Sequence, residues 1–284
     1  MHTGHRHRLG QGARRGRPPR RCPEYGHRLG VGDRRRSRIS PSAGRRQLHG
    51  IERDRRRARE VIDGTQRRLL AELGRKNAAV VLHDADPDAT VATIAAAAFA
   101  EAGQRCTATS RVLVHRSVFA DVRDRLIAAA GEHVLCSGLD ATTTMGPVVS
   151  PAQQSTIRGF VDRAVAQGAA VATPARDLST EFTEHGCFVS PTVVTDVTPD
   201  MEIWRDEIFG PVVSLIVFDT LDEAILVVNG SQYGLAAAIY TSDLAAADTF
   251  ARVVDVGQVA VNLPTSNWDV QMPFGGFKAS GSGH

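Results

Sequence analysis

The hydrophobic positions beyond Leu69 follow two alternating periods. Short runs of β-branched and aliphatic residues, typical of buried strands, alternate with stretches in which apolar residues recur every three or four positions, typical of amphipathic helices. This alternation predicts βαβ units and a largely parallel sheet. We expect strands at Ala79–Leu82, Val112–His115, Val212–Phe218, Gly234–Tyr240 and Gln258–Asn262, and an extended segment that contains a proline at Phe188–Val194.

Capping signals mark where the helices of this pattern begin. Asp86-Pro87-Asp88 combines an N-cap, a first-turn proline and an acid at the positive end of the helix dipole, and this helix is predicted to end at Gly103. Thr220 and Glu223 have the spacing of a capping box. Further helices are expected at Val118–Ala130, from Ser150-Pro151 to about Gln167, and at Asp243–Val253.

Residues 1–68 show neither period. Residues 1–70 contain 21 Arg and no Lys against six acidic residues, with many Gly, Pro and His. Such a segment buries too little apolar surface to offset its ordering entropy, so we predict that it is disordered. Three origins stay open: an arm that binds nucleic acid or another polyanion, a mitochondrial transit peptide, or GC-rich DNA translated out of frame. The abrupt change of composition near residue 65 favours the last.

The four cysteines, Cys22, Cys106, Cys136 and Cys187, lie at wide and irregular spacings. This spacing indicates neither a disulfide framework nor a zinc knuckle, so we expect no metal and a reducing, cytoplasmic setting. No apolar run approaches the roughly 18 residues needed to span a bilayer, which predicts a soluble protein with no membrane partner.

Cys106 is the candidate nucleophile. It follows the predicted helix stop at Gly103, stands beside Arg105, and is therefore expected on a loop, where a thiol with a lowered pKa can act as a nucleophile. The alternative is a small buried hydrophobic residue, which is the commoner role of a single cysteine. Cys106 alone does not decide between them.

Four short segments accompany Cys106. They are Glu72-Leu73-Gly74, Gly146-Pro147, Glu207-Ile208-Phe209-Gly210-Pro211-Val212 and Pro273-Phe274-Gly275-Gly276-Phe277-Lys278. In order and spacing they resemble the signature segments of the aldehyde dehydrogenase superfamily, and the resemblance covers residues 69–284. It implies an α/β catalytic domain with a largely parallel sheet and flanking helices, preceded by the disordered Arg-rich segment. Asn262-Leu263-Pro264-Thr265 is similar to the branch that oxidises 2-oxoglutarate semialdehyde and related short oxo-acid substrates.

The resemblance implies a role for each matching residue. Cys106 would attack the aldehyde carbon, the resulting thiohemiacetal would lose a hydride to NAD or NADP, and Glu72 would be the general base that activates water to hydrolyse the thioester. Glu207 matches the residue that binds the nicotinamide ribose, and Phe209 the residue that packs against the nicotinamide. Without the resemblance, Glu72 would be a surface carboxylate, and Glu207 and Phe209 would belong to a loop that leads into a strand.

Three further residues complete these expectations. Gly74 lies where the family's backbone approaches the cofactor, and Gln153 is assigned to the ribose side of the cofactor. Arg75 stands where family members usually have a second glycine. If that position needs a positive φ or close approach to the nicotinamide, an arginine costs about 1 kcal/mol or more and obstructs the cofactor.

The family's preceding nucleotide-binding domain has no match in residues 1–68, and the chain stops at His284, before the family's C-terminal strand, which crosses to a neighbouring subunit. We therefore expect impaired NAD(P) binding, and the homo-oligomers of the family are in question here. Two alternatives to an active oxidoreductase stay open: an inactive truncated remnant of such an enzyme, and an Arg-rich polyanion-binding protein. As the binding partner of this chain, we expect a small aldehyde substrate rather than nucleic acid.

Overall fold

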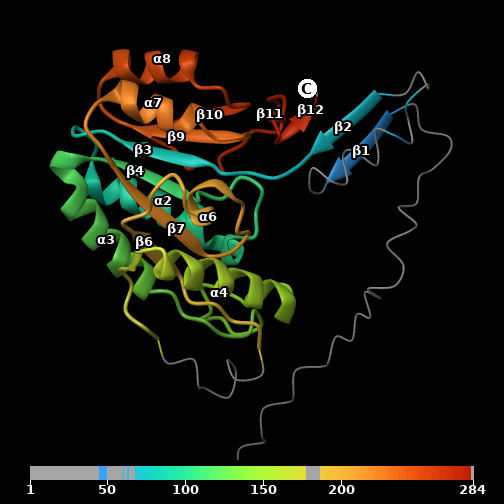
Figure 1. Cartoon of the computed structure of the whole chain (residues 1–284), viewed down its shortest axis with the longest axis vertical. Helices are drawn as coiled ribbons and strands as arrows, with labels where there is room; N and C mark the ends of the chain where they lie inside the picture. The colour runs from blue at the N-terminus through green and yellow to red at the C-terminus, as the bar shows by residue number, and fades with distance from the viewer. Residues whose placement is uncertain (1–44, 50–59, 61–62, 64–67, 177–185, 283–284) are drawn as a thin grey trace, which may run out of the picture. The chain divides into compact units, whose positions relative to one another are not determined.

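A seven-stranded sheet organises the part of the chain that the computed structural model describes, which is residues 45–49, 60, 63, 68–176 and 186–282. The strand order is β10-β9-β3-β4-β7-β6-β5, and every neighbouring pair is parallel except β5 with β6 (Figure 1). This confirms the predicted, largely parallel α/β architecture. The strands are β3 (Ala78–Val81), β4 (Arg111–His115), β5 (Ala170–Val171), β6 (Thr192–Thr195), β7 (Val212–Phe218), β9 (Ala236–Tyr240) and β10 (Gln258–Val261).

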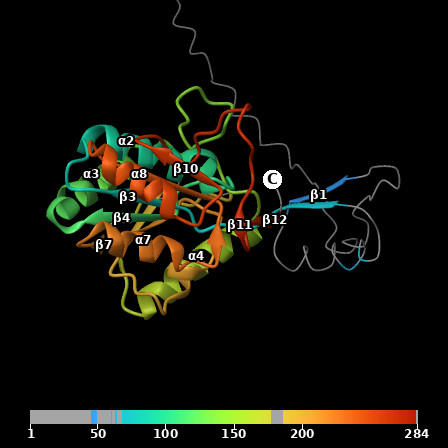
Figure 2. The same ribbon diagram turned by 90° about the horizontal axis from the view of Figure 1, so that it is seen from above.

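Helices cover both faces of this sheet, as Figures 1 and 2 show. Successive residues of a strand point to opposite faces, so Ala79 and Val81 enter one hydrophobic cluster and Ala78 and Val80 the other. Because both faces of the central strands are buried, these strands are mostly apolar rather than alternating, as in Ala78–Val81. The first cluster packs against α2 (Pro87–Phe99), α3 (Phe119–Gly131) and α4 (Pro151–Ala166), and the second against α7 (Leu221–Asn229) and α8 (Leu244–Val253).

The helices begin where the capping signals predicted. The side chain of Asp86 accepts a hydrogen bond from the Ala89 amide at 3.0 Å, and Ser150 and Thr220 cap α4 and α7 in the same way. The capping box is formed differently from the prediction. The Glu223 carboxylate accepts from the amide of Asp219, one residue before the cap, rather than from Thr220.

The first of these helices ends earlier than predicted. α2 ends at Phe99, and the short 3-10 turn η1 (Ala100–Gly103) follows it. Glu101, Ala102 and Gly103 all have positive φ, at 54°, 53° and 66°, so the backbone turns sharply before Cys106. The glycine stop was located correctly, but the two residues before it already lie in the left-handed region, which ends the helix.

Two small sheets accompany the seven-stranded sheet. β1 (Arg45–His49) pairs in parallel with β2 (Arg68–Glu72), which pairs antiparallel with β12 (Gly281–Ser282). β8 (Tyr233–Gly234) pairs with β11 (Phe277–Lys278). Most of residues 1–68, the segment predicted to be disordered, lies outside the described residues. β1 belongs to this segment and is described as a strand, which differs from the prediction. A short helix, α6 (Glu202–Arg205), precedes β7, and Arg116–Val118 forms the 3-10 turn η2. None of the helices in the described ranges combines the length and apolar character needed to cross a membrane.

Candidate active site

The loop that carries Cys106 is set by close backbone contact behind it. At Gly103, a Cβ atom would lie 2.2 Å from the carbonyl oxygen of Gly210, so the loop and the Gly210-Pro211 turn meet at a distance that only glycine allows. This contact brings the Cys106 loop against the segment that contains Glu207 and Phe209. Cys106 itself is exposed and carries a free thiol, as a nucleophile requires.

A buried amide holds the backbone of the Cys106 loop. Asn77 Nδ2 donates to the carbonyl oxygens of Cys106 and Ala108, both at 2.9 Å, and Asn77 Oδ1 accepts from the Ala236 amide at 3.2 Å. The Thr265 hydroxyl donates to the Thr107 carbonyl at 2.7 Å. The sequence analysis missed Asn77. A polar amide directly before a fully buried strand is the signal that would have identified it, because such a group must find partners.

Glu72 is the last residue of β2 and is almost fully buried, with 7% of its surface exposed. Its Oε1 atom has no hydrogen-bond partner among the described residues. Burial raises the pKa of the Glu72 carboxyl to about 7, because removing the carboxylate from water disfavours its charged form. A carboxyl with this pKa can take up or release a proton at neutral pH.

The surroundings of the Cys106 thiol correct one expectation from the sequence. Burial by neighbouring protein atoms raises the pKa of Cys106, and the negative charge of Glu72 raises it further, while Arg75 and Arg105 lower it. The lowered thiol pKa expected beside Arg105 is therefore wrong, because desolvation outweighs the positive charges. Gly74, two residues after Glu72, approaches Glu207, and the Cys106 loop contacts Gly210, so the fold brings the segments of the two predicted catalytic residues to one region.

Arg75 occupies the centre of the site. Its side chain is buried and donates from Nη2 to the Gly103 carbonyl at 2.6 Å, from Nε to the Ala108 carbonyl at 3.4 Å, and from Nη1 to Glu207 Oε1 at 3.0 Å. Its guanidinium also stacks on the Phe209 ring, 4.7 Å from the ring centroid. The positive φ considered for this position is not found, since Arg75 is not among the described residues with positive φ.

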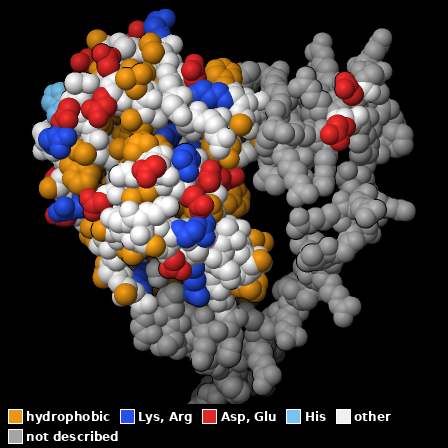
Figure 3. Space-filling view, viewed as in Figure 1, with side chains coloured by type: hydrophobic (Ala, Val, Ile, Leu, Met, Phe, Trp, Pro, Cys, Tyr) orange, Lys and Arg blue, Asp and Glu red, His pale blue; other side chains and the backbone are white. Residues whose placement is uncertain are grey.

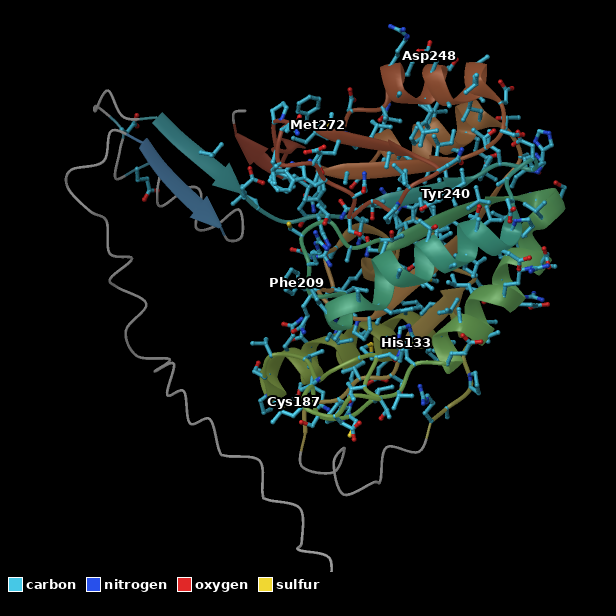
Figure 4. The ribbon with its side chains drawn as sticks, turned by 180° about the vertical axis from the view of Figure 1, so that it is seen from behind. His133, Cys187, Phe209, Tyr240, Asp248 and Met272 are labelled. Carbon is cyan, nitrogen blue, oxygen red and sulfur yellow. The ribbon has the colours of Figure 1, made fainter. Side chains whose placement is uncertain are left out.

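Glu207 and Phe209 lie in the segment that contacts the Cys106 loop, and Arg75 contacts both side chains, so their assignment to the cofactor stays a prediction. In Figure 4, Phe209 lies beside the C-terminal end of α2. Phe209 adopts a positive φ of 55° and is 37% exposed. Burial raises the pKa of Glu207, and the charges of Arg75 and Lys76 oppose that rise. At Gly74, a Cβ atom would lie 3.1 Å from Glu207 Oε2 and 2.8 Å from the Tyr233 ring, so this glycine permits the close approach of both side chains.

Two more side chains hold the Glu207–Phe209 segment. Gln153 Nε2 donates to the carbonyl oxygens of Ile208 and Phe209, at 2.9 and 3.1 Å. Lys76 Nζ donates to the Asp206 carbonyl at 2.7 Å, and complete burial lowers the pKa of Lys76 to about 7. The assignment of Gln153 to the cofactor stays a prediction. The sequence analysis missed Lys76, because a single lysine just before a strand does not by itself indicate a buried side chain.

The described part of the chain shows mixed surface charge and no metal cluster. On the face shown in Figure 3, basic and acidic side chains are interspersed among apolar ones. Among the described residues, no group of three His, Cys, Asp or Glu side chains could hold a metal ion. Asn262 has a structural role: its amide donates to the Thr241 carbonyl and accepts from the Thr241 amide, both at 2.9 Å.

Curated proteins with similar sequences are aldehyde dehydrogenases. The chain is 43% identical over 217 residues to aldehyde dehydrogenase citD of Monascus ruber, covering 75% of this chain and 42% of that protein. It is 40% identical over 216 residues to alpha-ketoglutarate semialdehyde dehydrogenase of Haloferax volcanii, covering 76% and 44%. The chain thus spans less than half the length of these relatives.

Solved structures give the same result. An aldehyde dehydrogenase mutant from Bacillus cereus matches with a TM-score of 0.79 and 34% identity, covering 84% of this chain and 47% of that one. Betaine aldehyde dehydrogenase from Staphylococcus aureus, solved in complex with NAD+, matches with a TM-score of 0.79 and 33% identity, covering 85% and 48%. The profile of the aldehyde dehydrogenase family matches residues 55–284. With the Cys106 loop, Glu72 and the Glu207–Phe209 segment gathered at one site, this match shows that the chain belongs to the aldehyde dehydrogenase family.

Proposed function

We propose that this chain carries the catalytic half of an NAD(P)-dependent enzyme that oxidises an aldehyde to a carboxylic acid. The observation that carries the proposal is the pairing of an exposed thiol, Cys106, with a buried carboxyl, Glu72, whose pKa is about 7. Nucleophilic catalysis through an acyl intermediate needs these two groups together: one to form the covalent bond and one to activate water.

The chain's own residues account for the covalent steps. The Cys106 thiolate adds to the aldehyde carbon and forms a thiohemiacetal. A thioester on Cys106 would follow once a bound NAD or NADP, which the chain does not itself supply, accepted the hydride of that carbon. Glu72 then removes a proton from water, the hydroxide attacks the thioester carbonyl, and the carboxylic acid leaves as the Cys106 sulfur regains its proton. At neutral pH about half of the Glu72 carboxyls are ionised, so the base is present in its active form.

The residues around Phe209 fit a nicotinamide cofactor only in part. Phe209 keeps 37% of its surface exposed, which suits packing against a planar ring, but one oxygen of Glu207 is held by Arg75. Glu207 and Phe209 would hold the cofactor, with Gln153 fixing their backbone. When bound, NAD or NADP supplies the hydride acceptor. The solved Staphylococcus aureus relative in complex with NAD+ supports this class of cofactor.

A semialdehyde is the substrate class that we propose. The segment Asn262-Leu263-Pro264-Thr265 supports this substrate class, as does the similarity to relatives named as semialdehyde dehydrogenases from Haloferax volcanii and Bacillus subtilis. The alternative is an inactive chain, which the contacts of Arg75 with Glu207 and Phe209 favour, because the same two side chains would hold the cofactor.

An oxidation assay separates these two hypotheses. The purified chain is incubated with NAD or NADP and a panel of aldehydes that includes 2-oxoglutarate semialdehyde, and the reduced nicotinamide is followed by its absorbance. An active enzyme gives turnover that Cys106→Ala abolishes and that Cys187→Ala, a change at a half-buried thiol outside the site, leaves in place. Absence of turnover with every aldehyde and both cofactors would refute the proposed activity for this chain.

A cofactor-independent assay tests the two catalytic roles. p-Nitrophenyl acetate acylates an exposed nucleophile and releases p-nitrophenol. We expect the unmodified chain to turn over, Cys106→Ala to release none above background, and Glu72→Gln to release one equivalent and then stop, because the acyl group stays on Cys106. Equal steady rates for the unmodified chain and the Glu72→Gln variant would contradict the role of Glu72.

A further inference from the structure

Arg75 connects the two halves of the candidate site. Its guanidinium donates to the carbonyl oxygens of Gly103 and Ala108, which stand on either side of Cys106 in the loop, and to the carboxylate of Glu207. The same group stacks on Phe209. The fork of an arginine makes this set of contacts possible, since it presents several donors in one plane, whereas a glycine would make none of them.

The charge of Arg75 acts on Cys106 from a buried position. The charged groups that act on the thiol are Arg75, Glu72 and Arg105. Arg105 is exposed and so is screened by water, whereas the side chain of Arg75 is 3% exposed. Of the two positive charges, Arg75 therefore has the stronger effect on the thiolate, and Glu207 offsets part of it through the ion pair.

We propose that Arg75 is the positioning residue of this site. Its hydrogen bonds link the Cys106 loop to the Glu207–Phe209 segment, and its positive charge stabilises the Cys106 thiolate. This inference rests on the proposed role of Cys106 as nucleophile and extends it. A consequence is that Arg75 and a bound cofactor compete for Glu207 and Phe209. A cofactor that binds Glu207 therefore breaks the ion pair between Arg75 and Glu207.

Two substitutions with opposite expected effects test the proposal. The rate of alkylation of Cys106 by iodoacetamide is measured from pH 6 to pH 10 on the full chain, with the modified peptide quantified by mass spectrometry. Arg75→Met removes the charge, and we expect alkylation at pH 7 to slow by roughly tenfold, equivalent to about one pKa unit. Glu207→Gln leaves Arg75 uncompensated, and we expect alkylation at pH 7 to speed up by at least about twofold. Arg75→Lys keeps a positive charge, so its pH profile is expected to lie between those of the unmodified chain and Arg75→Met.

Cys136 and Cys187 are internal controls for folding. If Arg75→Met unfolds the chain, their alkylation rates rise together with that of Cys106, and the decision then rests on Glu207→Gln and Arg75→Lys. If the role of Arg75 were purely structural, Arg75→Met and Glu207→Gln would change the alkylation rate of Cys106 in the same direction, because both remove the same contacts. That outcome, or unchanged pH profiles, would overturn the proposal. Because alkylation needs neither aldehyde nor cofactor, its result stands whether or not the chain oxidises aldehydes.

Discussion

Burial of Glu72 predicts that the stability of the folded chain falls as the pH rises. The pKa of Glu72 is raised from 4.5 to about 7 by burial. The folded state therefore binds this proton more tightly than the unfolded state, so its stabilising effect is complete below pH 4.5 and is lost as the pH rises through 7. A shift of this size corresponds to about 3 kcal/mol at most, and to about 1.5 kcal/mol after allowance for solvent screening.

Glu72→Gln removes the titrating group with little change of shape. Urea unfolding at pH 5.0 and pH 8.5, followed by tryptophan fluorescence, gives the change in unfolding free energy with pH for each chain. We expect the unmodified chain to lose about 1.5–3 kcal/mol more than Glu72→Gln between these two pH values. The matched control is Asp219→Asn, which changes an exposed carboxyl whose pKa the hydrogen bond from Arg116 lowers, and it should keep the loss attributed to Glu72. An equal loss in the unmodified chain and Glu72→Gln would refute the reasoning, because the buried carboxyl would then not be the group that titrates.

Two further substitutions test the framework of the site, and a third tests an exposed ion pair, all through the same urea unfolding. Gly103→Ala should destabilise the chain by at least about 2 kcal/mol, because its Cβ would meet the Gly210 carbonyl at 2.2 Å and its φ is positive; a change within error would mean that the backbone relaxes. Asn77→Ala should cost about 3 kcal/mol, since it removes the three hydrogen bonds of a buried amide, and Cys106 should then be alkylated at a different rate. Arg116→Ala, which breaks only an exposed ion pair with Asp219, should leave the unfolding midpoint unchanged, and a clear shift would show that exposed pairs matter here.

The pattern of apolar residues predicted most strands of the main sheet and its longer helices, but not β5 or α6. Val212–Phe218 was predicted with its observed bounds, because a run of seven residues, all β-branched or apolar except Ser214, between Gly-Pro and a capping signal is typical of a buried strand. The helix starts at Asp86, Ser150 and Thr220 also followed from local chemistry. The end of α2 was misplaced, because Glu101 and Ala102 adopt a left-handed turn that their residue types do not signal, directly before Gly103 meets Gly210, 107 positions away in sequence.

The sequence by itself determined the family and the identity of the candidate nucleophile, since Cys106, Glu72 and the Glu207–Phe209 segment are matched by local motifs. Only the tertiary structure decided what surrounds them. Desolvation raises the pKa values of Glu72 and Cys106, and it depends on which elements pack around each group. Arg75 appeared from the sequence as a substituted glycine that would strain the backbone or obstruct a cofactor. In the fold it bonds to both sides of the Cys106 loop and to Glu207, because residues distant in sequence meet at its guanidinium.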